Sequence, residues 1–163
     1  MNQAHQQQAE PHQNSNSALP DEFTHNSLEK AHVLLIDDDV VVLQTLSLMF
    51  SSMGFKVTTA MNADAIRQAN LDHFQCIILD IWLPDSYGDE TLQILANKGY
   101  KGAVLLISGK QKNEINSTAK LGLQHGLSVI GYCQKPVYKN DLTRILTRAP
   151  HLYSPSADIQ SRQ

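Results

Sequence analysis

The chain has 163 residues, 42% of them apolar, which is enough for one domain with a packed core and too little for two large ones. Its formal net charge of −3 gives no reason to expect a nucleic-acid or membrane partner. No apolar run approaches the length of a membrane-spanning helix, and the polar amino terminus lacks the apolar segment of a signal peptide, so we expect a cytoplasmic protein.

The ends of the chain differ in composition from the middle. Residues 1–28 are rich in Gln, Asn, His and Ser and carry few apolar side chains, so they predict a disordered polar tail. Residues 149–163 are similar and predict a disordered tail or a cut linker. The remaining residues, 31–148, are expected to form one folded domain.

Within this domain, the first apolar run predicts a buried strand at residues 32–37. Asp39 can cap the helix that follows, and this helix should end near Met53 because Gly54 comes next.

The rest of the domain alternates in the same way. Strands are predicted at residues 55–60, 74–80, 103–108 and 127–133, and helices at residues 62–70, 88–99, 112–126 and 139–148. Asn62 is the expected cap of the second helix, and Gly122 weakens the fourth. Five strands with helices between and after them predict an α/β fold of three layers, a doubly wound parallel sheet with helices on both faces.

Acidic and basic residues are unevenly distributed along the chain. Residues 21–90 hold twelve Asp or Glu and three Lys or Arg, whereas residues 98–148 hold nine Lys or Arg and two Asp or Glu. The first part is suited to a cation. The second part could face an acidic partner or carry ordinary solvated lysines.

Charged and hydroxyl side chains end several of the predicted strands or follow them closely. In chain order they are Asp37, Asp38, Asp39, Asp80, Ser108 and Lys135. The carboxyl ends of parallel strands meet at one edge of a sheet, where such folds bind ligands, so we expect these side chains to converge. Taken singly, each has a structural explanation, such as a helix cap or a solvated lysine. Their joint spacing favours a site.

A group of carboxylates at one edge of a sheet needs a cation. Two carboxylates about 4 Å apart repel each other by about 4 kcal/mol at an effective dielectric constant of about 20. Mg²⁺ bound by oxygen ligands relieves this repulsion and keeps positions open for water and phosphate oxygens. Asp80 can then stay ionised, as a nucleophile must, while Lys135 and Ser108 can hold phosphoryl oxygens.

Four segments, VLLIDDD, LDIWLPDSYG, LLISG and GYCQKP, together resemble the receiver domain of two-component response regulators. The resemblance includes paired acids after the first strand, a proline four residues and a glycine eight residues after Asp80, and a Lys-Pro pair after the fifth strand. It covers residues 31–148 and implies the flavodoxin-like strand order 2-1-3-4-5. The segments KGYKGAVLLISG and LGLQHGLSVIGYCQKP are particularly similar to receivers joined to cyclic-di-GMP phosphodiesterase domains.

The resemblance implies a role for each residue of the phosphoryl site. Asp80 would be the phosphoacceptor, and Ser108 and Lys135 would hold the phosphoryl group. Ser108 and Tyr132 would be the switch residues, because Tyr132 matches the aromatic side chain that turns inward on activation.

The resemblance also implies a set of Mg²⁺ ligands. Asp38 and Asp80 would bind the ion directly, together with the backbone carbonyl of Trp82. Asp37 would act mainly through water.

The function implied is that of a phosphoacceptor in a two-component phosphorelay. The partners would be a histidine kinase or a phosphotransfer protein, and an unknown downstream protein. The chain would then be a signalling module and not an enzyme acting on other substrates. Whether it forms a homodimer is left open.

Two other functions stay open at this stage. The chain could be the receiver fragment of a larger regulator whose output enzyme, such as a cyclic-di-GMP phosphodiesterase, is lost or truncated. It could instead be a metal-dependent aspartyl phosphatase of the haloacid dehalogenase type. That family, however, requires an acid two residues after its nucleophile, where this chain has Trp82.

The first predicted helix contains no charged residue. Beyond the face needed for packing, Val41, Leu48 and Met49 extend its apolar character around the helix. In the receiver family this helix contributes to docking the helical bundle that carries the phosphohistidine. These three residues are therefore a candidate partner face, with coverage by the chain's own tails as the alternative.

Overall fold

A computed structural model describes residues 30–109 and 112–153. Its main sheet has five parallel strands: β1 (His32–Ile36), β2 (Lys56–Ala60), β3 (Cys76–Asp80), β6 (Ala103–Ser108) and β7 (Ser128–Gln134). Their order is β2-β1-β3-β6-β7, which confirms the predicted order 2-1-3-4-5.

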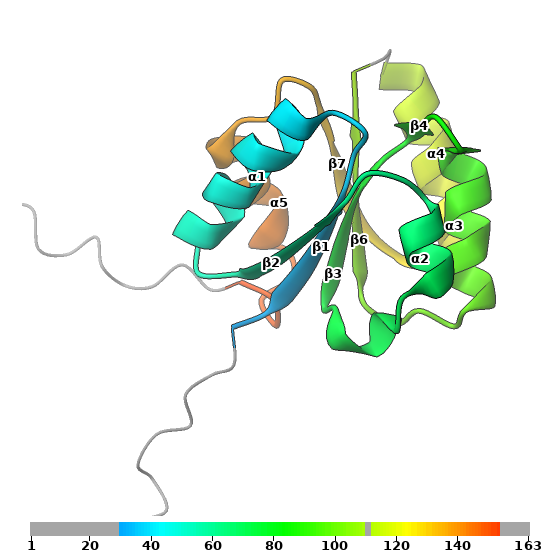
Figure 1. Ribbon diagram of the computed structural model, residues 1–163, viewed down its shortest axis with the longest axis horizontal. Coiled ribbons are helices and arrows are strands. Elements are labelled where there is room, and N and C mark those ends of the chain that lie inside the picture. Colours follow the sequence, from blue (N-terminus) through cyan, green and yellow to red (C-terminus); the bar gives the residue numbers. More distant parts are fainter. Residues whose placement is uncertain (1–29, 110–111, 154–163) are drawn as a thin grey trace, which may run out of the picture.

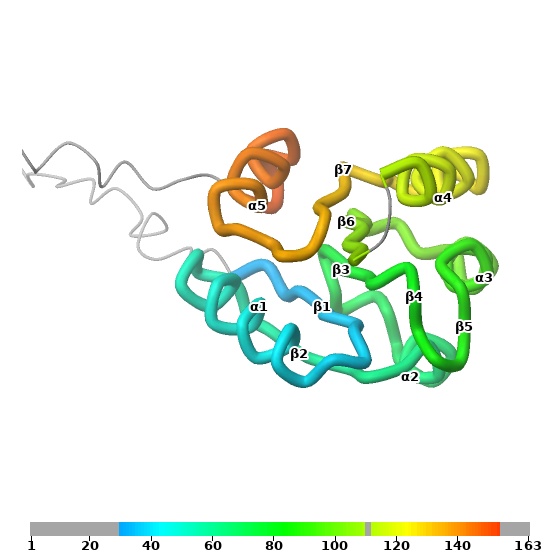
Figure 2. Tube along the Cα trace, turned by 90° about the horizontal axis from the view of Figure 1, so that it is seen from above, coloured from blue at the N-terminus to red at the C-terminus, as the bar shows by residue number. Residues whose placement is uncertain are grey.

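Five helices cover the two faces of this sheet. They are α1 (Val40–Ser52), α2 (Asp64–Gln68), α3 (Gly88–Asn97), α4 (Lys112–Gln124) and α5 (Lys139–Leu146). Figure 1 and Figure 2 show α1 and α5 on one face and α2, α3 and α4 on the other. The predicted three-layer doubly wound α/β fold is therefore confirmed. Among the described residues, no helix has the length and apolar character needed to span a bilayer.

The central strands are apolar on both faces because helices cover both. On β1, Val33 and Leu35 belong to the cluster beneath α1 and α5, while Leu34 and Ile36 belong to the cluster beneath α2, α3 and α4. Every residue of β3 and β6 is buried, as the continuous apolar runs predict. The edge strand β2 contains only exposed and half-buried residues.

Most elements lie where the sequence predicts them, and Asp39 caps α1 by accepting hydrogen bonds from Val41 N and Val42 N. The second helix is shorter than predicted and spans only Asp64–Gln68, with Ala63 at the position before it. The predicted cap Asn62 does accept a hydrogen bond, from Ala65 N at 3.3 Å. A 3₁₀ turn at Leu71–His73 follows the helix.

Two further short strands were not predicted. β4 (Trp82–Leu83) and β5 (Ser86–Tyr87) form a hairpin directly after Asp80.

The folded region extends beyond the predicted boundary at Arg148. Ala149 and Leu152 are buried in the cluster beneath α1 and α5. The ring of Tyr153 stacks on Phe55 with centroids 5.8 Å apart. The tail predicted for residues 149–163 is thus corrected for residues 149–153, because the side chains of Ala149, Leu152 and Tyr153 pack on the core. The predicted tail at residues 1–28 and residues 154–163 lie outside the described residues.

Candidate functional site

Three of the predicted site residues meet at the carboxyl edge of the sheet. β1 and β3 are neighbouring parallel strands with Ile36 opposite Leu79, so the acids Asp37 and Asp80 follow at adjacent positions. Lys135, just after β7, reaches across to both. Its Nζ lies 2.6 Å from Oδ2 of Asp37 and 2.6 Å from Oδ2 of Asp80.

The charged groups of Asp37 and Asp80 are buried away from solvent. Asp37 is fully buried and Asp80 is 4% exposed. Burial raises the pKa of Asp37 above its ordinary value, and the ion pair with Lys135 offsets this only in part. Burial by itself would lower the pKa of Lys135, but hydrogen bonds from its ammonium to Asp37 and Asp80 outweigh burial and raise it. Lys135 therefore stays protonated.

The acids can also accommodate a cation. Asp37, Asp38 and Asp80 each offer a carboxylate oxygen, and these oxygens lie within 4.8 Å of one another. Asp38 is exposed, so the group opens to solvent on one side. Oδ2 of Asp37 is buried and, apart from the ion pair with Lys135, has no hydrogen-bond partner among the described residues. Clustered carboxylates with one open side fit a hard divalent ion such as Mg²⁺.

The hairpin after β3 adjoins this acid group. The N–H of Trp82 donates to Oδ1 of Asp80 at 3.0 Å, which orients that carboxylate. The Trp82 ring packs edge-on against Tyr87, with centroids 5.2 Å apart. The predicted role of the Trp82 carbonyl as a metal ligand stays a prediction.

Ser108 and Tyr132 lie on the strands next to Lys135. Ser108 ends β6 fully buried, and its carbonyl accepts a hydrogen bond from the Lys135 N–H at 2.7 Å. Tyr132 is half-buried on β7 and packs against the core beneath α2, α3 and α4. Ser108 is therefore joined through the backbone to Lys135, and Tyr132 lies on β7, three residues before Lys135. The switch roles of both residues stay predictions.

Comparison with known proteins agrees with this geometry. The family model for the response regulator receiver domain matches residues 33–147. The chain belongs to the response regulator receiver family. Such receivers interact with histidine kinases or phosphotransfer proteins. With the family shown, the aspartyl phosphatase alternative is not favoured.

Related proteins are consistent with the receiver assignment. The cell cycle response regulator CtrA of Brucella ovis is 35% identical over 111 residues, which are 68% of this chain and 46% of the relative. The receiver thus spans about half the length of the curated relatives it matches.

Solved structures give the same fold. A response regulator from Colwellia psychrerythraea has a TM-score of 0.65 at 29% identity, covering 73% of this chain and 95% of that one. The signal receiver domain of an HD domain-containing protein from Pseudomonas fluorescens Pf-5 has a TM-score of 0.62 at 21% identity, covering 76% and 88%. At that identity the second likeness shows the fold alone.

The candidate partner face on α1 is partly accessible in the receiver. Val41 and Leu48 are 68% and 74% exposed, whereas Met49 is half-buried and packs on the core beneath α1 and α5. Leu48 lines a hollow between α1 and the end of β2, together with Val40 and Met61. The apolar surface is therefore made by Val41 and Leu48 more than by Met49, and its role as a partner face stays a prediction.

Sequence reasoning missed one acid near the site. Asp85, at the tip of the β4–β5 hairpin, accepts hydrogen bonds from the backbone at the start of α2. The sequence shows Asp85 only as part of a Pro-Asp turn. Its hydrogen-bond partners lie about twenty residues earlier in the chain, so local patterns do not indicate this contact.

Proposed function

We propose that this receiver is a phosphoacceptor whose Asp80 takes a phosphoryl group from a histidine kinase or a phosphotransfer protein. The observation that carries the proposal is the position of Lys135 Nζ, 2.6 Å from both Asp37 and Asp80, beside the open acid group. A buried carboxylate paired with an ammonium at the end of a strand is held rigidly for attack.

Mg²⁺ would be held by the carboxylates of Asp38 and Asp80 and the carbonyl of Trp82, with Asp37 acting mainly through water. When bound, the ion supplies positive charge that offsets the carboxylates and the phosphoryl oxygens.

In the transfer step, a carboxylate oxygen of Asp80 attacks the phosphorus of a phosphohistidine. The new P–O bond forms as the P–N bond breaks, and the departing imidazole takes up a proton from solvent. Lys135 would exchange its contact with Asp80 Oδ2 for a phosphoryl oxygen, and the Ser108 hydroxyl would donate a hydrogen bond to another. Water then hydrolyses the acyl phosphate, which releases inorganic phosphate and returns the Asp80 carboxylate.

Phosphorylation of Asp80 would change the shape of one face of the receiver. Movement of Ser108 toward the phosphoryl group would leave room for Tyr132 to turn inward, which would alter the face made by α4, β7 and α5. A downstream protein would bind that face, and Val41 and Leu48 on α1 would serve docking of the phosphodonor. We propose a cytoplasmic signalling module without nucleic-acid contact, which catalyses only its own phosphorylation and dephosphorylation.

A second candidate is that this receiver is part of a larger regulator. The observation behind it is that the chain spans 46% of the length of its CtrA relatives. An output enzyme such as a cyclic-di-GMP phosphodiesterase would then lie on another part of the protein.

The deciding experiment is formation of a beryllofluoride complex and phosphorylation by acetyl phosphate, both with and without Mg²⁺. The wild-type chain should give both products only with Mg²⁺, and Asp80→Asn should give neither. Asp89→Asn is a matched control, because Asp89 is an exposed acid on α3 whose carboxylate accepts a local hydrogen bond from Glu90 N. Labelling that persists in Asp80→Asn would contradict the assignment.

A further inference from the structure

The hairpin after Asp80 is too small to hold its own position. It consists of two residue pairs, Trp82 with Tyr87 and Leu83 with Ser86, and it does not join the five-stranded sheet. An isolated two-stranded hairpin is marginal in water. Contacts with the rest of the receiver must therefore fix it.

The tip of the hairpin is fixed by Asp85. Its two carboxylate oxygens lie 3.1 and 3.0 Å from Ala63 N, and Oδ2 also accepts from Asp64 N at 3.2 Å. These amides begin α2 and have no acceptor within the helix, and the Ala63 side chain cannot cap them. Asp85 thus caps α2 from a distant part of the chain, and Figure 2 shows the hairpin reaching toward α2.

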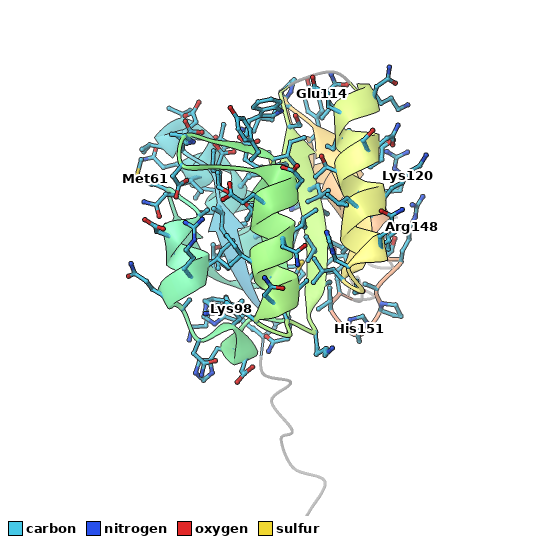
Figure 3. All side chains as sticks on the ribbon, turned by 90° about the vertical axis from the view of Figure 1, so that its right-hand side faces the viewer. Met61, Lys98, Glu114, Lys120, Arg148 and His151 are labelled. Atoms are coloured by element: carbon cyan, nitrogen blue, oxygen red, sulfur yellow. The ribbon has the colours of Figure 1, made fainter. Side chains whose placement is uncertain are left out.

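Helix α2, whose first amides donate to Asp85, has further polar contacts with the hairpin tip and with α3. Nη1 of Arg67 on α2 lies 4.0 Å from Oδ2 of Asp85, and its Nη2 lies 3.9 Å from Oε1 of Glu90 on α3. At the other end of α2, Nζ of Lys98 donates to the Arg67 carbonyl at 2.8 Å. Figure 3 shows Lys98 at the end of α3, beside α2. The hairpin tip is therefore tied to a fixed element.

The contact between Asp85 and α2 completes a series of contacts that links the two buried acids. On one side, the N–H of Asp37 donates to the Ala60 carbonyl at 3.2 Å, so the end of β1 holds the turn that leads into α2. Asp85 joins the start of α2 to the hairpin. On the other side, the N–H of Trp82 donates to Asp80 Oδ1 at 3.0 Å. The two buried acids thus lie at the two ends of one connected set of contacts.

We propose that Asp85 is a positioning residue for the metal site: by clamping the hairpin tip to α2, it holds the backbone of Trp82 in place beside Asp80. This inference rests on the proposed function, in which the Trp82 carbonyl is a Mg²⁺ ligand. Asp85 is not a member of the acid group, and its oxygens are directed at amides. Residues that support ligands in this way typically change metal affinity about 10- to 100-fold when replaced.

A through-space charge effect has to be separated from positioning. Asp38, Asp85 and Glu90 line one hollow of about 480 Å³. Removing the charge of Asp85 or of Glu90 therefore makes the electrostatic potential there less favourable for a cation. Glu90→Gln removes a charge from this hollow and keeps an oxygen to accept from the Ser86 hydroxyl. Glu90 faces the side chain of Arg67 on α2, 3.9 Å away, whereas among the described residues the α2 amides Ala63 N and Asp64 N donate to Asp85. Glu90→Gln therefore leaves these hydrogen bonds in place and is the charge-matched control for Asp85→Asn.

The experiment is a Mg²⁺ titration followed by the fluorescence of Trp82, which is the one tryptophan of the chain. Asp85→Ala should weaken Mg²⁺ binding about tenfold. Asp85→Asn retains one acceptor oxygen, so it should bind Mg²⁺ more tightly than Asp85→Ala and more weakly than Glu90→Gln. Thermal unfolding without Mg²⁺ establishes that each variant is folded at the titration temperature.

Equal Mg²⁺ affinity of Asp85→Asn and Glu90→Gln would overturn the proposal, even if Asp85→Ala fails to fold. The proposal would also be overturned if Asp85→Ala unfolds at a lower temperature but keeps the wild-type Mg²⁺ affinity, because the role of Asp85 would then be structural only. Asp80→Asn distinguishes failure of the role proposed for Asp85 from failure of the proposed phosphoacceptor function. If it binds Mg²⁺ as the wild-type chain does, the proposed function fails as well, whereas its loss of binding leaves that function standing.

Discussion

At the scale of single residues, Asp37 lies where its charge serves the proposed metal site but lowers the stability of the fold. Its carboxylate is fully buried next to Asp80, and one ammonium, that of Lys135, faces both acids. Without a cation the group therefore carries more negative than positive charge. Burial raises the pKa of Asp37, so ionising this carboxyl costs folding free energy. Neutralising Asp37 leaves Lys135 paired with Asp80, so no buried charge is left without a partner.

Asp37→Asn should raise the free energy of unfolding in EDTA at pH 7 by about 1 kcal/mol. The pKa of Asp37 is raised in the folded chain, so its ionisation lowers stability as pH rises from about 3.8 through the folded pKa. The gain should therefore shrink between pH 7 and pH 4. Urea unfolding at both pH values measures it, with the exposed Asp72→Asn as control. A loss of stability at pH 7 would contradict this account.

At the scale of elements, Gly122 decides how closely α4 packs. The sequence suggests only that this glycine weakens the helix. In the structure, a Cβ at position 122 would lie 2.7 Å from Val129 Cγ2 on β7 and 3.2 Å from Leu92 Cδ1 on α3. The glycine thus permits α4 to lie against both elements, and Figure 3 shows α4 beside α3 on this face.

Gly122→Ala should lower the free energy of unfolding by about 1–2 kcal/mol, because overpacking outweighs the helix preference for alanine of about 1 kcal/mol. Gln124→Ala, at an exposed position of the same helix, gains helix preference without a clash and should leave stability equal or slightly higher. Chemical denaturation of both variants makes the comparison. Higher stability in Gly122→Ala would show that α4 can shift without loss.

At the scale of the whole molecule, the segment after α5 completes the core. Leu152 is 7% exposed and Ala149 is 3% exposed, both within the cluster beneath α1 and α5. The Tyr153 ring lies on Phe55, between α1 and β2. The segment after α5 is therefore packed against the connection between α1 and β2.

Leu152→Ala should destabilise the receiver by about 2 kcal/mol, the low end for a buried leucine, since the site lies near the boundary of the core. His151→Ala changes an exposed neighbour and should have little effect. Thermal unfolding of the two variants measures the difference. Equal melting temperatures would mean that residues 149–153 add nothing to the core.

The sequence by itself determined the alternation of strands and helices, and with it the parallel sheet. It also determined which residues end the strands, so that Asp37, Asp80, Ser108 and Lys135 could be predicted to share one edge. These features follow from local patterns, because apolar periodicity and capping residues act within a few positions of the chain.

Only the tertiary structure decided the contacts between distant parts of the chain. Examples are the reach of Lys135 to two acids at once, the cap on α2 from Asp85, the clearance at Gly122 and the packing of Leu152. Each depends on the spatial position of a side chain whose partner lies many residues away. Local composition contains no information about that separation, so these contacts appear only once the layers are assembled.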